Sequence, residues 1–336
     1  MPSSPIADPF AQVCAPGGTG CAAINGYAVP AIPTALPAVP TDLNTGNSVN
    51  NSGGPCTGTD IQNGHCFVSH LTHGCPDPGA TSPPTNKNGC ALYTAGPYPG
   101  GISVDTSGGK SAVAVFDPGL YYVTGGLALK SGSTVRPGTG AGDGTGGVTF
   151  YFAGSGTTAG TVQVDANSGK NTAVDAFNTQ SGSGSLPLGV ACTASSIVPG
   201  NVPSTVTGNI LLGPCTGYYG DPLGTSDLPN GEQRGFLFFQ DRSGQSIDPS
   251  WGGGGQFLLA GTMYFHSCDA TGTGTGCGSA PSYYNDILSL SGNSGSGTYV
   301  LGSIVADNLT LGGTSGITMD LNPSKTNSIL KVSILQ

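Results

Sequence analysis

The sequence predicts an all-β protein whose chain winds as a parallel, right-handed β-solenoid (β-helix), and three observations lead to this fold class. Short β-branched and aromatic runs alternate with Gly, Asn, Asp and Ser, as in many strands joined by tight turns. No window keeps a helical period, and Glu232 is the only Glu. The runs are about three or four residues long, shorter than most sandwich strands, with a corner roughly every six to ten residues. A β-sandwich remains the alternative, because its turn spacing overlaps with the one seen.

Composition and charge exclude several functional classes. Gly (59) and Pro (26) are abundant, but the apolar runs argue against disorder. The 9 Lys and Arg are scattered in a chain of formal charge −9, so no basic stripe can follow a nucleic acid backbone. No apolar run reaches the roughly 18 residues that a membrane span needs. We therefore expect neither nucleic-acid binding nor a membrane-spanning segment.

The first predicted region, residues 1–54, is a Pro-rich extended arm or linker. Within residues 27–40, prolines recur every three or four positions, which favours polyproline II over a packed element. Such a segment either leads into the domain or lies along a neighbouring molecule. The second interpretation predicts a homo-oligomer or filament whose neighbours are joined through this arm.

The second region, residues 55–96, is a loop region rich in Cys and His. The ten cysteines form an even set in Gly-rich sequence, which indicates disulfides and an oxidising compartment. Proximity suggests five pairs, each adding roughly 2–3 kcal/mol, although other pairings within 56–90 are equally allowed. The suggested pairs are Cys14 with Cys21, Cys56 with Cys66, Cys75 with Cys90, Cys192 with Cys215, and Cys268 with Cys277.

A zinc site in this second region is the competing interpretation. His65, His70 and His73 lie among the cysteines and could supply imidazole ligands. The Cys spacing is loose and contains no Cys-x-x-Cys knuckle, so we expect disulfides with surface histidines and no cofactor. A calcium ion at Asp143 has no support, because the regular Asp spacing of a dedicated loop is missing.

The third region, residues 97–336, is the predicted solenoid domain. Each coil would need about 20–25 residues and would stack on its neighbours, with one inward residue of each run joining an apolar ladder. Gly/Ser/Thr-rich excursions such as 153–161, 181–186 and 270–282 would be loops between coils. The predicted strands are 113–116, 120–123, 127–129, 148–152, 162–164, 210–212, 236–239, 257–259, 263–265, 287–290, 304–305, 309–311 and 317–319.

Several of these runs, in order, carry a family resemblance: 117–129, 147–152, 235–242, 259–265 and 304–311. As a set they resemble the C-terminal region of bacterial Flp (Tad-type) pilus-assembly proteins of the TadG-like group, and residues 7–11 are similar to the segment that opens that region. The resemblance implies an exported, envelope-associated or surface protein with a β-helical domain and no catalytic residues. The Cys/His-rich region departs from the family pattern.

A polysaccharide-degrading β-helix enzyme is the catalytic alternative. Glycoside hydrolysis needs two carboxylates at a set separation, and lyases need clustered acids with a base. His266 could serve as a base, but it ends a probable strand. The candidate acids are Asp117, Asp143, Asp241, Asp248, Asp269 and Asp307, and no Asp-Asp pair occurs among them. We therefore expect no enzyme activity.

The run from Phe236 to Arg242 ends in the polar cluster Gln240-Asp241-Arg242 and is the strongest single motif of the resemblance. We interpret it as a strand and its corner. Phe236 and Phe238 would alternate with their neighbours between the core and the outer surface. Gln240 and Asp241 would bond the turn backbone, and Arg242 would pair with Asp241 or Asp248.

Taken together, these patterns predict a non-enzymatic extracellular structural protein of a bacterial surface appendage or filament. The alternative is a carbohydrate-binding adhesin that binds surface glycans. Its aromatic platforms would be loop tyrosines, although we favour a packing role for these: Tyr93, Tyr98, Tyr218, Tyr219, Tyr283 and Tyr284.

Overall fold

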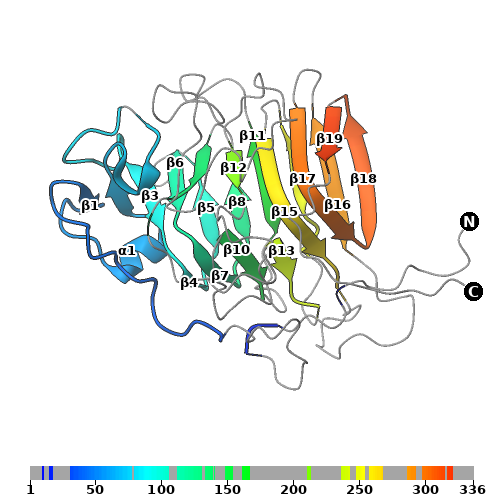
Figure 1. The fold of residues 1–336 in the computed structure, drawn as a ribbon, viewed down its shortest axis with the longest axis horizontal. Coiled ribbons are helices and arrows are strands. Elements are labelled where there is room, and N and C mark those ends of the chain that lie inside the picture. Colours follow the sequence, from blue (N-terminus) through cyan, green and yellow to red (C-terminus); the bar gives the residue numbers. More distant parts are fainter. Residues whose placement is uncertain are drawn as a thin grey trace, which may run out of the picture.

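The computed structural model is mostly β and confirms the solenoid (Figure 1). Thirteen strands join one hydrogen-bonded sheet and six join a second. None of the helices in the described part is long and apolar enough to cross a membrane. The structure describes residues 10, 15–17, 31–77, 79–105, 112–130, 133–138, 140, 148–153, 161–166, 210–212, 236–242, 247–253, 257–267, 286–292, 297–314 and 316–320.

The strands stack into three parallel faces. The first face contains β3 (Cys90–Tyr93), β6 (Val113–Phe116), β9 (Thr134–Pro137), β12 (Ile210–Leu212), β15 (Phe257–Phe265), β17 (Gly297–Ala306) and β19 (Gly316–Asp320). The second contains β4 (Gly96–Tyr98), β7 (Gly119–Val123), β10 (Val148–Phe152), β13 (Phe236–Gln240) and the later halves of β15 and β17. The third contains β5 (Ile102–Val104), β8 (Leu127–Leu129), β11 (Val162–Ala166), β14 (Ser250–Gly253), β16 (Ile287–Gly292) and β18 (Asn308–Gly313).

The register gives the length of each coil directly. Ala91 pairs with Ala114, and Ala114 with Val135, so the first two coils take 23 and 21 residues. Thr298 pairs with Ile317, which gives 19 residues for the last coil. These values agree with the predicted period of about 20–25 residues. The coils between them are longer, and the residues that lengthen them fall outside the described ranges.

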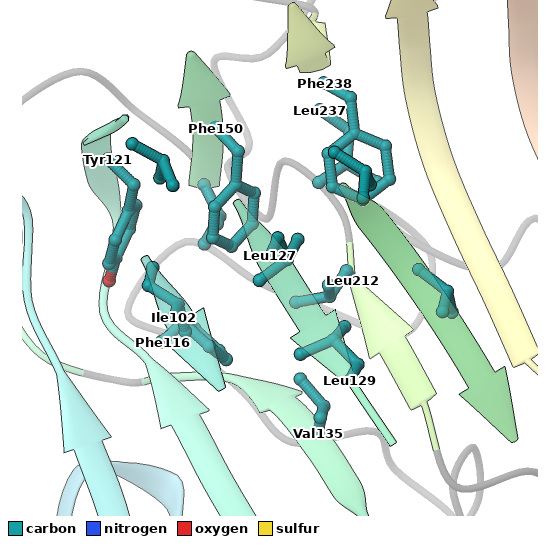
Figure 2. Packing of buried hydrophobic residues seen from close by; sticks show 14 of the residues in the cluster. Ile102, Phe116, Tyr121, Leu127, Leu129, Val135, Phe150, Leu212, Leu237 and Phe238 are labelled. Carbon is teal, nitrogen blue, oxygen red and sulfur yellow. The ribbon is translucent and has the colours of Figure 1, made fainter. Parts of the chain in front are cut away.

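Apolar side chains from all three faces fill the interior (Figure 2). Tyr121, Phe150 and Phe238 follow one another on the second face, with ring centroids 5.0 Å and 5.7 Å apart. Leu127 on the third face and Leu212 on the first point at this aromatic row. Each such side chain contributes about 1.5–3 kcal/mol when it is fully buried. The inward ladder that the sequence predicts is therefore the core of the molecule.

An antiparallel cap covers the N-terminal end of the stack. β1 (Ser48–Asn50) pairs with β2 (Cys66–Val68), and β2 pairs with β3, both in antiparallel fashion. Helix α1 (Gly58–Gln62) lies between them in sequence and begins with a capping box formed by Thr57 and Asp60. The short 3₁₀ turn η2 (Thr72–Gly74) follows β2. Because this cap turns against the direction of the coils, it closes one end of the solenoid (Figure 1).

The described parts of the Pro-rich arm contact the chain's own solenoid. The Oγ1 of Thr94, just after β3, donates to the carbonyl of Ala38 at 2.9 Å. Further towards the N-terminus, Phe10 is buried among Phe236 and Tyr264 of the second face. The arm thus touches coils near both ends of the stack.

Candidate functional site

The predicted strand-turn motif is strand β13, but strict alternation of its side chains is wrong. Phe236 and Phe239 pack outside the coil, whereas Leu237 and Phe238 both join the inner core. The pairing with β15 shifts register between Phe236 and Phe238, which marks a β-bulge. A bulge inserts one extra residue and re-aims the side chains beside it. The bulge explains why two consecutive residues point inward.

The polar end of the motif meets a buried aspartate that the sequence did not single out. Gln240 Nε2 donates to Asp286 Oδ2 at 2.6 Å, instead of bonding the adjacent turn backbone as expected. Asp286 Oδ1 accepts from the backbone N–H of Ile247 at 2.9 Å. Asp286 lies just before β16, where it follows an Asn-rich turn signal, and this position was its only sequence signal. The motif therefore ends in a contact between coils 46 residues apart.

Two candidate residues of the enzyme interpretation, His266 and Asp307, are brought together beside Asp286. His266 Nδ1 lies 2.5 Å from Asp307 Oδ1, and both residues are buried. Asp307 Oδ2 accepts from the backbone N–H groups of Ser267 and Asp286, each at 3.2 Å. A third candidate, Asp248, uses its Oδ1 to accept from the N–H of Ile287 at 3.1 Å.

These carboxylates are bonded as structural groups. Every described oxygen of Asp286 and Asp307 accepts a hydrogen bond, mostly from backbone N–H groups of neighbouring coils. A general base needs a free lone pair within reach of a substrate proton. Buried acids that bind backbone donors instead satisfy groups that the corners would otherwise leave unpaired. We therefore interpret this cluster as a polar seam that holds successive corners in register.

The remaining members of the motif lie outside this seam. Arg242 Nη1 donates to the carbonyl of Phe10 at 2.6 Å, so it holds the N-terminal arm. The Asp241 carboxylate lies near Tyr151, where burial and this carboxylate raise the pKa of the phenol above its usual value. Asp241 and Arg242 thus belong to the outer side of the second face.

Asp117 is also buried, and it binds a histidine that we expected at the surface. His73 Nδ1 lies 2.7 Å from Asp117 Oδ2, and His73 Nε2 lies 3.2 Å from Asp42 Oδ1. Burial alone would lower the pKa of His73, but the hydrogen bonds and charges of Asp117 and Asp42 outweigh it and raise the pKa above 6.5. His73 is therefore a link between the cap and the first coils, while His70 is exposed as predicted.

Four cysteines of the cap form two of the predicted disulfides, Cys56–Cys66 and Cys75–Cys90. Disulfide sulfur atoms cannot act as thiolate ligands for zinc. Among the described residues, no group of three or more His, Cys, Asp or Glu could hold a metal ion. The two disulfides also indicate an oxidising compartment outside the cytoplasm.

The C-terminal end of the stack presents apolar side chains to solvent. Leu309 and Leu311 of β18 pair in register with Leu288 and Leu290 of β16. Leu288 and Leu290 point into the core and are buried, whereas Leu309 and Leu311 are 56% and 64% exposed. Because paired residues of parallel strands share a face, the two exposed leucines occupy core positions that no described coil covers. We call Leu309 and Leu311 the open end.

Other candidates lie outside the described residues: Cys14, Cys21, Asp143, Cys192, Cys215, Tyr218, Tyr219, Cys268, Asp269, Cys277, Tyr283 and Tyr284. Comparison of the chain with protein-family models, curated proteins and solved structures finds no match. The resemblance to TadG-like pilus-assembly proteins therefore stays a prediction.

Proposed function

We propose that this chain is a non-enzymatic, extracellular structural subunit of a bacterial surface appendage or filament. The observation that carries the proposal is the asymmetry of the two ends. The N-terminal end is closed by the disulfide-bonded cap, whereas the open end exposes core-facing Leu309 and Leu311. Exposed strand ends and apolar core positions favour the addition of another strand or coil.

The mechanism is end-on association with a second copy of the chain. A partner that covers the open end removes two leucine side chains from water, each worth about 1.5–3 kcal/mol when fully buried. The seam at Asp286 and Asp307 keeps the last corners in register, so the open end is presented by an ordered coil. The extended arm offers a second point of attachment between neighbours, because a segment held at few points can exchange between copies.

Sedimentation velocity and electron microscopy of the full chain over a range of concentrations test this proposal. We expect self-association that weakens at least tenfold in the double variant Leu309→Asp/Leu311→Asp. Thr310→Asp is the matched control, since Thr310 lies on the same exposed strand with its side chain on the opposite face. A full chain that stays monomeric throughout, for instance because residues 321–336 cover the leucines, would contradict the proposal.

A carbohydrate-binding adhesin is the second candidate. Of its six tyrosines, the two in the described part are buried: Tyr93 on β3 and Tyr98 on β4 are 2% and 0% exposed. Tyr93 stacks on Phe116 with ring centroids 4.7 Å apart. Their rings are thus packing elements and offer no exposed platform, in agreement with the packing role that we favoured for them.

A further inference from the structure

A cavity of about 290 Å³ lies where the cap meets the first coil. Its walls come from both parts: the end of α1 and the loop that follows it, and the strands β3 and β5 with the corner between β4 and β5. Binding pockets for small molecules usually measure about 300–1,000 Å³, so this one has room for a single small ring. The lining includes Gln62, Asn63, His65, Tyr93, Gly101 and Ser103.

The lining is polar and carries no formal charge apart from the titratable histidine. It combines two amides, an imidazole, a hydroxyl and the phenol edge of Tyr93, whose ring face is already stacked on Phe116. Gln62 Nε2 donates to the carbonyl of Pro97 at 2.6 Å, which fixes its amide in one orientation. Ser103 Oγ donates to Asp105 at 3.0 Å and so keeps its lone pairs for an incoming donor.

His65 gives the cavity an unused hydrogen-bonding group. Its Nε2 is buried, and it has no hydrogen-bond partner among the described residues. Buried polar atoms in folded proteins are nearly always paired, and leaving one unpaired costs about 1–3 kcal/mol. A ligand hydroxyl could satisfy this atom as either a donor or an acceptor, because a neutral imidazole presents one of each.

We propose that this cavity binds one neutral polyhydroxyl ring, such as the terminal sugar unit of a glycan, with His65 Nε2 bonded to a ligand hydroxyl. An anion is disfavoured because no Lys or Arg lines the cavity and Asp105 lies beside it. An apolar ligand is disfavoured because amide and hydroxyl groups would lose water without gaining partners. The cavity is at the capped end, so binding there is independent of association through the open end.

Histidine NMR tests the proposal at the site itself. The chain has four histidines, so His65, His70, His73 and His266 give separate imidazole signals. We would titrate the full chain with glucose, galactose, mannose and N-acetylglucosamine, and with glucuronate and inorganic phosphate as anionic probes. At least one neutral sugar should shift the His65 signal while the other three stay in place, and an oligosaccharide ending in that sugar distinguishes a glycan end from a free sugar.

His65→Leu supplies the assignment and the affinity test. It should weaken binding at least tenfold, measured by calorimetry or by saturation transfer to the sugar. His70→Leu is the matched control, because His70 is an exposed histidine of the same cap and should retain wild-type affinity. Melting curves of both variants verify that the cap stays folded. The proposal is overturned if no neutral sugar shifts His65 up to tens of millimolar, or if only the anionic probes do.

Discussion

At the scale of single residues, Gly125 decides how closely two coils approach. It lies at the corner between β7 and β8, directly against the corner of the preceding coil. A Cβ at this position would lie 2.4 Å from the backbone N of Gly101 and 2.5 Å from the carbonyl C of Gly100. Backbone atoms on a stacked coil cannot rotate away as a side chain can. Glycine is therefore required here by the packing of the coils.

We expect Gly125→Ala to lower the free energy of unfolding by about 1–3 kcal/mol, the usual range for overpacking. The measurement is urea denaturation followed by circular dichroism. Gly100→Ala is the control, because nothing lies within 4 Å of a Cβ at Gly100 and its φ is not positive. Equal losses from the two substitutions would show that coil contact at Gly125 is not the cause.

At the scale of elements, His73 connects the η2 turn of the cap to the corner after β6. Its backbone has a φ of 50°, in the left-handed region, and its ring bridges Asp117 and Asp42. A residue with this backbone conformation and two carboxylate partners holds the cap against the first two coils. The protonated ring satisfies both partners at once, which is why its pKa is raised above 6.5.

This raised pKa predicts how stability depends on pH. A group whose pKa is higher in the folded state binds its proton more tightly there, so its contribution is complete below pH 6.5 and is lost as the pH rises through the folded value. Unfolding free energies between pH 5.5 and 8.5 should therefore fall towards high pH. His73→Asn, which tolerates the left-handed backbone, should flatten this slope, whereas His70→Asn should keep it. An unchanged slope in His73→Asn would rule out this link.

Local patterns predicted the elements well wherever burial followed them. The apolar runs at 113–116 and 148–152 are strands β6 and β10 with the same bounds. Strands β9 and β14 were not predicted because Arg136, Pro137 and the glycines after Trp251 break the local signature. Runs 257–259 and 263–265 were predicted as two strands, but Gly261 lets one strand, β15, bend across two faces at a φ of 101°. Contacts between coils, as with Gly125, fall outside what local sequence encodes.

The same limit applies to the functional residues. Each of His266, Asp307 and Gln240 stood out in the sequence, yet their meeting point Asp286 did not, because register between coils brings them together. His65 was noticed as a possible zinc ligand, and its role in lining a cavity depends on how the cap packs on β3 and β5. Loops of variable length between coils hide such register from the sequence.

At the scale of the whole molecule, the arm runs along the stack and crosses the coils that otherwise contact only their neighbours. Solenoid stability is approximately a sum of coil terms and nearest-neighbour interfaces. The arm adds a contact of longer range: Pro37 lies against Gly96 in the first coil, and Phe10 lies against Phe236 and Tyr264 in later coils. Arg242 fixes the Phe10 carbonyl at 2.6 Å.

Phe10 is therefore expected to be the anchor that keeps the arm on its own solenoid. Phe10→Ala removes a buried ring, at a cost of about 3 kcal/mol, and because the arm forms no core of its own the loss should appear as local detachment. Hydrogen exchange of residues 15–17 and of the β13 and β15 amides should speed up by as much as roughly a hundredfold, the factor that corresponds to this energy. Val39→Ala, at a 38% exposed position of the same arm, should leave those rates unchanged. If the two variants exchange alike, the arm is held by its backbone contacts instead, and exchange of arms between copies would have to begin elsewhere.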